Sequence, residues 1–206
     1  MTELLDCYLP VFKQVTRLIS APVDATGYEE DRQACIELLE QAIHHASLLD
    51  LGEEEKDVAR FAVIAWLDET ILCSGLPWRH LWQSELLQRK YLNTTVAGER
   101  FFTCLEQMDP ASEQARQVFL FCLQNGFHGQ YSAPEDNSAL LEVINSQRQL
   151  CLPQAWRYWP NDTSVTSPAT ELPGTLSLRK SPLLIMTAGL LVLYGSLFFL
   201  LHNDVM

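Results

Sequence analysis

The sequence predicts an all-α protein, a bundle of about seven to eight helices followed by one C-terminal transmembrane helix. Three observations predict this class. Apolar residues recur every three to four positions through most of the first 150 residues. No stretch alternates between apolar and polar residues for long enough to form a strand. One uncharged run near the C-terminus has the length of a helix that spans a bilayer.

Length and charge narrow the function classes. The chain has 206 residues, with 14 Lys and Arg against 26 Asp and Glu, and a formal charge of −12. This length suits one compact domain with an appendage. The acidic balance disfavours non-specific nucleic-acid binding and polybasic attachment to a membrane surface, because both need clustered basic residues. A hydrophobic content of 48% excludes a wholly disordered chain.

The first half of the domain is predicted to hold four helices. Pro10 lies inside the first and should kink it or mark its true start. The third begins with acidic residues, which the helix dipole favours in a first turn. Its centre, 61–67, is apolar on nearly all sides, which predicts a buried position. The four expected helices cover residues 2–20, 28–49, 53–73 and 78–92.

Three further helices are expected at residues 97–108, 113–124 and 137–150. Ser112 is placed to cap the second of these. After it, Gly126 and Gly129 alternate with aromatic residues. Because glycine accepts positive φ angles, this pattern predicts a shaped turn with Phe127 and Tyr131 pointing inward. The helical domain is thus predicted to cover residues 1–152.

Residues 153–182 are predicted to form a linker, because they are rich in Pro, Ser and Thr. The next 19 residues, 183–201, carry no charge, and as a helix they would span about 28 Å, close to the thickness of the bilayer core. A buried core helix is the alternative. Residues 202–206 would form a short tail beyond the membrane.

The orientation of this predicted span follows from charge. Arg179 and Lys180 precede the span, and no Lys or Arg follows it. The positive-inside rule therefore places residues 1–180 in the cytoplasm. The N-terminus has acidic residues where a signal peptide carries basic ones. We therefore expect a tail-anchored, single-pass protein.

Small residues occur within the predicted span at a spacing of seven. Ala188 and Gly195 form one such pair, and Gly189 and Ser196 form the other. Two turns of helix place each pair on one face, which permits close packing of helices. The functional interpretation is self-association or packing against a membrane partner, and the alternative is that these small residues are incidental.

Metal and cofactor sites are not expected. The six cysteines contain no C-x-x-C pair, so they are predicted to be reduced thiols. Glu40 and His44 could share one helix face, but a catalytic metal needs three converging ligands. The adjacent His44 and His45 point about 100° apart on a helix and cannot chelate one metal well. The chain has no phosphate-binding loop and no zinc-protease or nucleophile-elbow motif.

Asp68 and Glu69 are the most informative polar pair, because they end the most apolar helical stretch. Burying two unpaired carboxylates would be costly. Three interpretations remain open. The pair makes structural ion pairs, or it lines an acidic docking cleft, or it performs general acid–base chemistry with a histidine in a tail-anchored, metal-dependent hydrolase. For the first interpretation, the candidate partners are Arg79, Arg89 and Arg100.

An ordered set of residues resembles the TssL subunit of type VI secretion systems, also called the DotU or IcmH-like family. The C-terminal hydrophobic run completes the order. The resemblance covers about residues 1–150 and the anchor. Its residues are Ala65–Glu69, Trp78 and Trp82, Gly98–Phe102 with Leu105, and Cys122–Tyr131.

The resemblance implies a hook-shaped cytoplasmic bundle held at the inner membrane, with no catalysis and no cofactor. It implies a subunit that couples TssM, the IcmF-like membrane protein, to baseplate subunits such as TssK. The peptidoglycan-binding domain of some relatives is not expected here. The same resemblance admits a DotU subunit of a type IVB system. The candidate docking residues are Asp68, Glu69, Trp78, Trp82 and Glu99.

Overall fold

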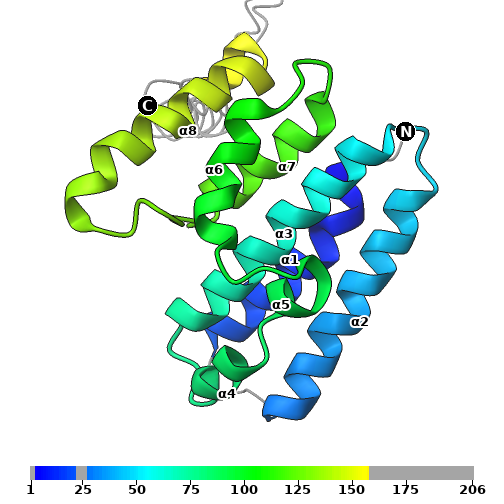
Figure 1. Ribbon diagram of the computed structural model, residues 1–206, viewed down its shortest axis with the longest axis vertical. Helices are drawn as coiled ribbons and strands as arrows, with labels where there is room; N and C mark the ends of the chain where they lie inside the picture. The colour runs from blue at the N-terminus through cyan, green and yellow to red at the C-terminus, as the bar shows by residue number, and fades with distance from the viewer. Residues whose placement is uncertain (1–2, 22–26, 158–206) are drawn as a thin grey trace, which may run out of the picture. The chain divides into compact units, whose positions relative to one another are not determined.

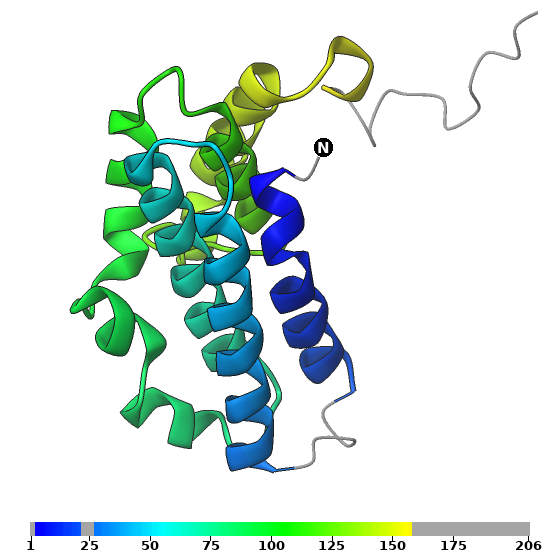
Figure 2. The ribbon, with the colours of Figure 1, turned by 90° about the vertical axis from the view of Figure 1, so that its right-hand side faces the viewer.

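The computed structural model describes residues 3–21 and 27–157, which belong to one compact unit. This part of the chain is helical and contains no strand. Figures 1 and 2 show the helices packed around the central α3. The α-helices are α1 (Leu4–Ser20), α2 (Tyr28–Ser47), α3 (Glu53–Cys73), α4 (Arg79–Ser84), α5 (Leu87–Leu92), α6 (Ala97–Gln107), α7 (Glu113–Gln124) and α8 (Asn137–Cys151).

The all-α prediction is confirmed, and most helix positions agree with the sequence pattern. The third and sixth expected helices begin and end as predicted. Pro10 lies inside α1 and does not mark its start. Two short 3-10 turns were not anticipated, at Pro134–Asp136 and Gln154–Trp156.

One predicted helix is wrong. The segment 78–92 was expected to form a single helix. It forms two short helices, α4 and α5, which are separated by an interruption at Glu85 and Leu86. The interruption turns the first N–H groups of α5 toward the carboxylate of Asp68. A contact with a distant side chain therefore decides where this helix breaks.

α3 is the centre of the bundle, as its apolar composition predicts. It packs against α1, α2, α4, α5, α6 and α7. Every residue from Phe61 to Asp68 is buried. Because neighbours surround this buried stretch of α3, a polar side chain within it must find a partner inside the protein.

The predicted membrane segment follows the part of the chain that the structure describes. None of the helices within residues 3–21 and 27–157 is both long enough and apolar enough to cross a bilayer. The predicted span 183–201 and tail 202–206 lie outside the described residues. The same holds for Ala188, Gly189, Gly195 and Ser196, and for most of the predicted linker.

Candidate functional site around the acidic pair of α3

Three carboxylates of α3 accept hydrogen bonds from the backbone of other segments. Near the start of α3, Glu55 accepts the N–H groups of Gln114 and Ala115 at 2.9 and 3.1 Å. These are early residues of α7, whose N–H groups have no partner within their own helix. Ser112, the predicted cap, makes no side-chain capping bond. The cap of α7 therefore comes from a helix about 60 residues earlier.

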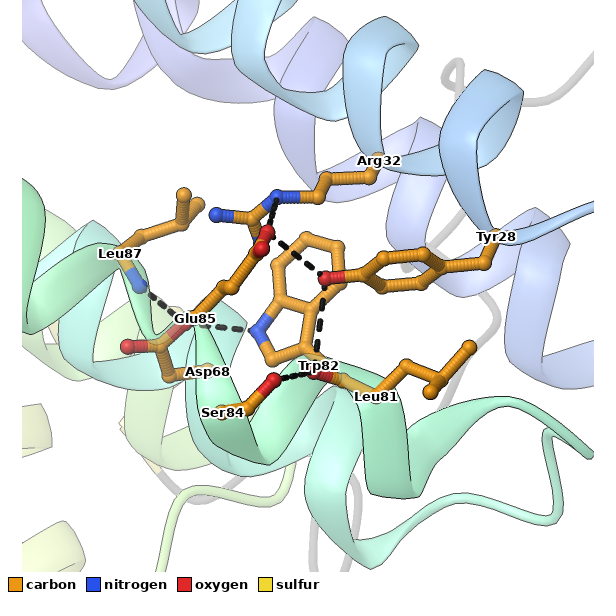
Figure 3. A network of polar contacts seen from close by, with 8 residues as sticks. All are labelled: Tyr28, Arg32, Asp68, Leu81, Trp82, Ser84, Glu85 and Leu87. Atoms are coloured by element: carbon orange, nitrogen blue, oxygen red, sulfur yellow. Dashed lines mark hydrogen bonds and ion pairs between the residues drawn. The ribbon is translucent and has the colours of Figure 1, made fainter.

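Asp68 is fully buried and caps α5 in the same way. Its carboxylate accepts the backbone N–H of Leu87 at 3.0 Å and of Gln88 at 2.8 Å. It also accepts the indole N–H of Trp82 at 2.8 Å. Figure 3 shows Trp82 and Leu87 converging on this carboxylate. Asp68 thus joins α3 to both α4 and α5.

Two opposing effects act on the proton of Asp68. Burial raises the pKa of this carboxyl above its usual value of 3.8, because the charged form is poorly solvated. The N–H donors of Gln88, Trp82 and Leu87 lower the pKa and offset part of that rise. The site is thus built from donors that suit an ionised acceptor.

Glu69 is directed to a different segment. Its two oxygens accept the N–H groups of His128 at 2.7 Å and of Gly129 at 2.9 Å. The imidazole Nδ1 of His128 lies 3.9 Å from the carboxylate. Burial raises the pKa of Glu69, and these donors counteract the rise. With 22% of its side chain exposed, Glu69 is within reach of solvent.

The loop that Glu69 holds has the predicted shape. Gly126 and Gly129 have φ angles of 86° and 53°. A Cβ atom on Gly129 would lie 2.6 Å from the carbonyl oxygen of Gly98, so the two backbones are in direct contact. Phe127 is 1% exposed, and Tyr131 packs edge-on against Phe102 at 4.7 Å. The two glycine-containing motifs of the sequence therefore pack against each other.

On the other side of the acidic pair, Trp82 is held from two directions. The guanidinium of Arg32, on α2, lies 4.8 Å above the indole ring. Arg32 also pairs with Glu85 at 3.2 Å, and Glu85 accepts the Tyr28 hydroxyl at 3.1 Å. Figure 3 shows these groups gathered around the Trp82 ring. This cation–π and ion-pair network fixes α4 against α2.

The candidate docking residues separate into an inner and an outer group. The inner group is buried: Asp68 and Trp82 are 0% exposed, and Trp78 is 6% exposed. Asp68 and Trp82 support the site from inside. Glu69 is partly exposed, and Glu99 is exposed. Glu99 follows Gly98, whose backbone contacts the loop that Glu69 holds. Glu99 is therefore next in sequence to a residue that contacts that loop.

Arg79, Arg89 and Arg100 were the expected ion-pair partners of the acidic pair, and this prediction is wrong. Among the described residues, no ion pair joins either carboxylate to an arginine. Arg79 donates to the carbonyl oxygen of Ser74 at 2.7 Å. Arg100 lies over the ring of Phe61, 5.4 Å from its centroid. Asp68 and Glu69 are instead satisfied mainly by backbone N–H groups, which the sequence pattern did not indicate.

The metal interpretation gains no support from the geometry. Within the part of the chain that the structure describes, no group of three His, Cys, Asp or Glu side chains could hold a metal ion. Glu40 accepts the Tyr91 hydroxyl at 2.7 Å. His44 and His45 are exposed, with ring centroids 6.1 Å apart.

Sequence reasoning missed two residues of this region. The sequence pattern places Glu55 among the acidic residues that favour the start of a helix, and nothing in its position indicates that it caps α7. The pattern does not single out Arg32. An arginine on a largely apolar helix face was the available signal, and it is 8% exposed in the structure.

The fold and the site together define a helical-bundle domain whose central acidic pair holds its own backbone in place. Comparison with known families makes the assignment specific. The family model of the type VI secretion system protein DotU matches residues 3–203. The chain belongs to this family. A search of the curated proteins found no match.

Three solved structures share the fold. The cytoplasmic domain of TssL from Acinetobacter baumannii matches with a TM-score of 0.66 and 24% identity, covering 73% of this chain and 98% of that one. TssL from Vibrio cholerae matches with a TM-score of 0.62 and 24% identity, covering 72% and 94%. SciP/TssL of the type VI system of enteroaggregative Escherichia coli 042 matches with a TM-score of 0.56 and 26% identity, covering 69% and 86%.

Proposed function

We propose that this protein is a non-enzymatic subunit of a type VI secretion membrane complex, anchored in the inner membrane by residues 183–201. In this role it couples the IcmF-like subunit TssM to baseplate components such as TssK. The family match along nearly the whole chain carries the proposal. The description of that family names the type VI system. We therefore prefer a role in a type VI system to a role in a type IVB system.

The chemistry around Asp68 and Glu69 supports a structural role. A general acid or base must reach a substrate. Asp68 has no exposed surface, and its oxygens already accept three N–H groups. The oxygens of Glu69 hold two more. These bonds favour an architectural role for the pair over the hydrolase alternative.

The surface next to the loop at 126–131 is the proposed cytoplasmic docking site. Glu99 is exposed at the start of α6, and Glu69 reaches solvent beside His128. The bonds from His128 and Gly129 to Glu69, and the backbone contact between Gly98 and Gly129, hold this surface in shape. A rigid surface with exposed carboxylates suits a partner that presents basic residues.

Co-purification from detergent-solubilised membranes tests the coupling. Full-length bait should recover an IcmF-like membrane protein together with baseplate subunits. Glu99→Lys should lose the baseplate subunits and keep the membrane partner. Glu37→Lys is the matched control, because Glu37 is also exposed but lies on α2. Recovery of neither partner by the unaltered chain would refute the proposal.

The anchor has its own test. A chain that lacks residues 179–206 should move from the membrane fraction to the soluble fraction and lose the IcmF-like partner. Replacing Gly189 and Gly195 with Leu should weaken partner recovery without loss of membrane insertion, if these small residues pack against another helix. Membrane retention of the truncated chain would place the anchor elsewhere.

A further inference from the structure

A shallow apolar groove lies between α1 and α7 and shares no residue with the Trp82 network. It has a volume of about 410 Å³. Its apolar surface comes from Leu9 and Phe12 of α1 and Phe121 of α7. The polar residues that complete the lining are Lys13, Thr16, Arg17, Ser20 and Asn125.

The floor of this groove is rigid. Phe12 is 3% exposed, and its ring lies 4.4 Å from that of Trp66. Phe121 stands edge-on against Phe12 at 4.7 Å and remains partly exposed. The Trp66 indole N–H donates to the carbonyl oxygen of Asn125 at 3.0 Å, which fixes the end of α7. Preformed aromatic surface of this kind binds a partner at little ordering cost.

The charge of the groove is opposite to that of the protein. Lys13 and Arg17 are both exposed, and neither forms an ion pair with a described residue. No carboxylate lines the groove. Three other grooves of the described part each include a carboxylate, and their acidic residues are Asp6, Glu106, Glu113 and Glu142. The chain as a whole carries −12.

We propose that this groove binds an acidic amphipathic helix of another protein. Lys13 and Arg17 are four residues apart on α1, so they lie one turn apart on the same face. A helix with carboxylates at the same spacing pairs with both while its apolar stripe covers Leu9 and Phe121, as in other helix-in-groove complexes.

Charge and shape favour a protein partner over a lipid surface. An anionic membrane would attract Lys13 and Arg17, but it would repel the strongly acidic remainder of the domain. The apolar residues also line a groove, which fits a narrow helix better than a flat bilayer surface. The proposal does not depend on the secretion role or on Glu99, so the two can fail separately.

Photo-cross-linking in the bacterium that makes the protein tests this inference. A photoreactive amino acid replaces Thr16, an exposed groove residue, in the full-length chain, and the cross-linked peptide is sequenced by mass spectrometry. The expected peptide comes from another protein, has apolar residues at helical spacing and is net acidic. A peptide from a second copy of this chain, a lipid adduct, a basic peptide or no adduct would overturn the proposal.

Charge reversal makes the test specific. Lys13→Glu with Arg17→Glu should lower the cross-link yield about tenfold, as expected for loss of two charge pairs. Arg89→Glu with Lys90→Glu is the matched control, with the same charge change on the exposed face of α5. Reversing the acidic residues of the captured helix to Lys should restore the yield with the first variant. An equal effect of both double variants would overturn the proposal.

Discussion

The two neighbouring carboxylates of α3 hold different parts of the molecule in different environments. Asp68 is 0% exposed and ties down the turn between α4 and α5 with three N–H donors. Glu69 has 22% of its side chain exposed and holds the loop at 128–129 with two. Adjacent residues on a helix point about 100° apart, so a sequence neighbour is not a structural neighbour.

The difference in exposure between Asp68 and Glu69 predicts different roles for the two carboxylates. The Asp68 contact is inside the core, where neither solvent nor a partner reaches it. The Glu69 contact reaches the surface next to His128. We therefore expect changes at Asp68 to act mainly on stability, and changes around Glu69 to act on the shape and charge of the proposed docking surface.

The largest effect is expected for Asp68→Ala, which leaves three buried N–H donors without an acceptor. Each such loss costs about 1–3 kcal/mol. The free energy of unfolding should fall by about 3–5 kcal/mol in urea titrations of a fragment covering residues 1–178, followed by tryptophan fluorescence. Asp57→Ala is the control, because it removes only a surface pair with Arg60. Similar losses in both variants would refute the buried clamp.

Gly129→Ala should have the next largest effect. The added Cβ would meet the Gly98 carbonyl oxygen at 2.6 Å and the Phe102 ring at 2.9 Å, and φ is already +53°. We expect a loss of about 2–4 kcal/mol. Gly126→Ala shares the positive φ but meets nothing within 4 Å, so it should cost only about 1–2 kcal/mol. Equal losses of stability in the two variants would mean that the positive φ angle, and not the close contact with Gly98, accounts for the cost at Gly129.

Glu69→Gln should cost less than Asp68→Asn. An amide keeps only one acceptor oxygen, so each variant loses charge-assisted bonds to the backbone. Solvent can replace a partner at Glu69 and cannot at Asp68. The expected loss for Glu69→Gln is about 1–2 kcal/mol in the same unfolding assay. If Glu69→Gln lost more stability than Asp68→Asn, the buried carboxylate would not be the more important of the two for stability, and the prediction would be contradicted.

The smallest effect is the pH dependence at Glu69. Burial raises its folded-state pKa above 4.5, so the folded protein binds this proton at higher pH than the unfolded chain does. Stability contributed by this group therefore rises as pH falls through the folded-state pKa, and it levels off below 4.5. Wild type should gain stability relative to Glu69→Gln across that window. A relative loss on acidification would contradict the raised pKa.

The sequence predicted the helices well where their own periodicity decides them. The apolar stretch 61–67 identified α3 as the centre of the bundle, and the glycine and aromatic pattern at 126–131 identified a turn with positive φ angles. These signals are local, because a helix face or a glycine conformation depends on residues close in the chain.

The sequence failed where a distant side chain decides. The break before α5 depends on Asp68, about 20 residues earlier, and the cap of α7 depends on Glu55. Ser112 satisfied the local rule for a cap and yet makes no capping bond. The same limit applied to the acidic pair, for which arginine partners were expected and backbone N–H groups were found.

The sequence by itself determined the helical class, the central position of α3 and the family resemblance, because periodicity and ordered motifs are properties of the chain. Only the tertiary structure decided that Asp68 and Glu69 serve separate segments, and that Lys13 and Arg17 flank an apolar groove in an acidic protein. Those facts depend on which segments meet in space. Burial is the physical reason, because a polar group removed from water needs a hydrogen-bond partner, and the fold determines which partners are within reach.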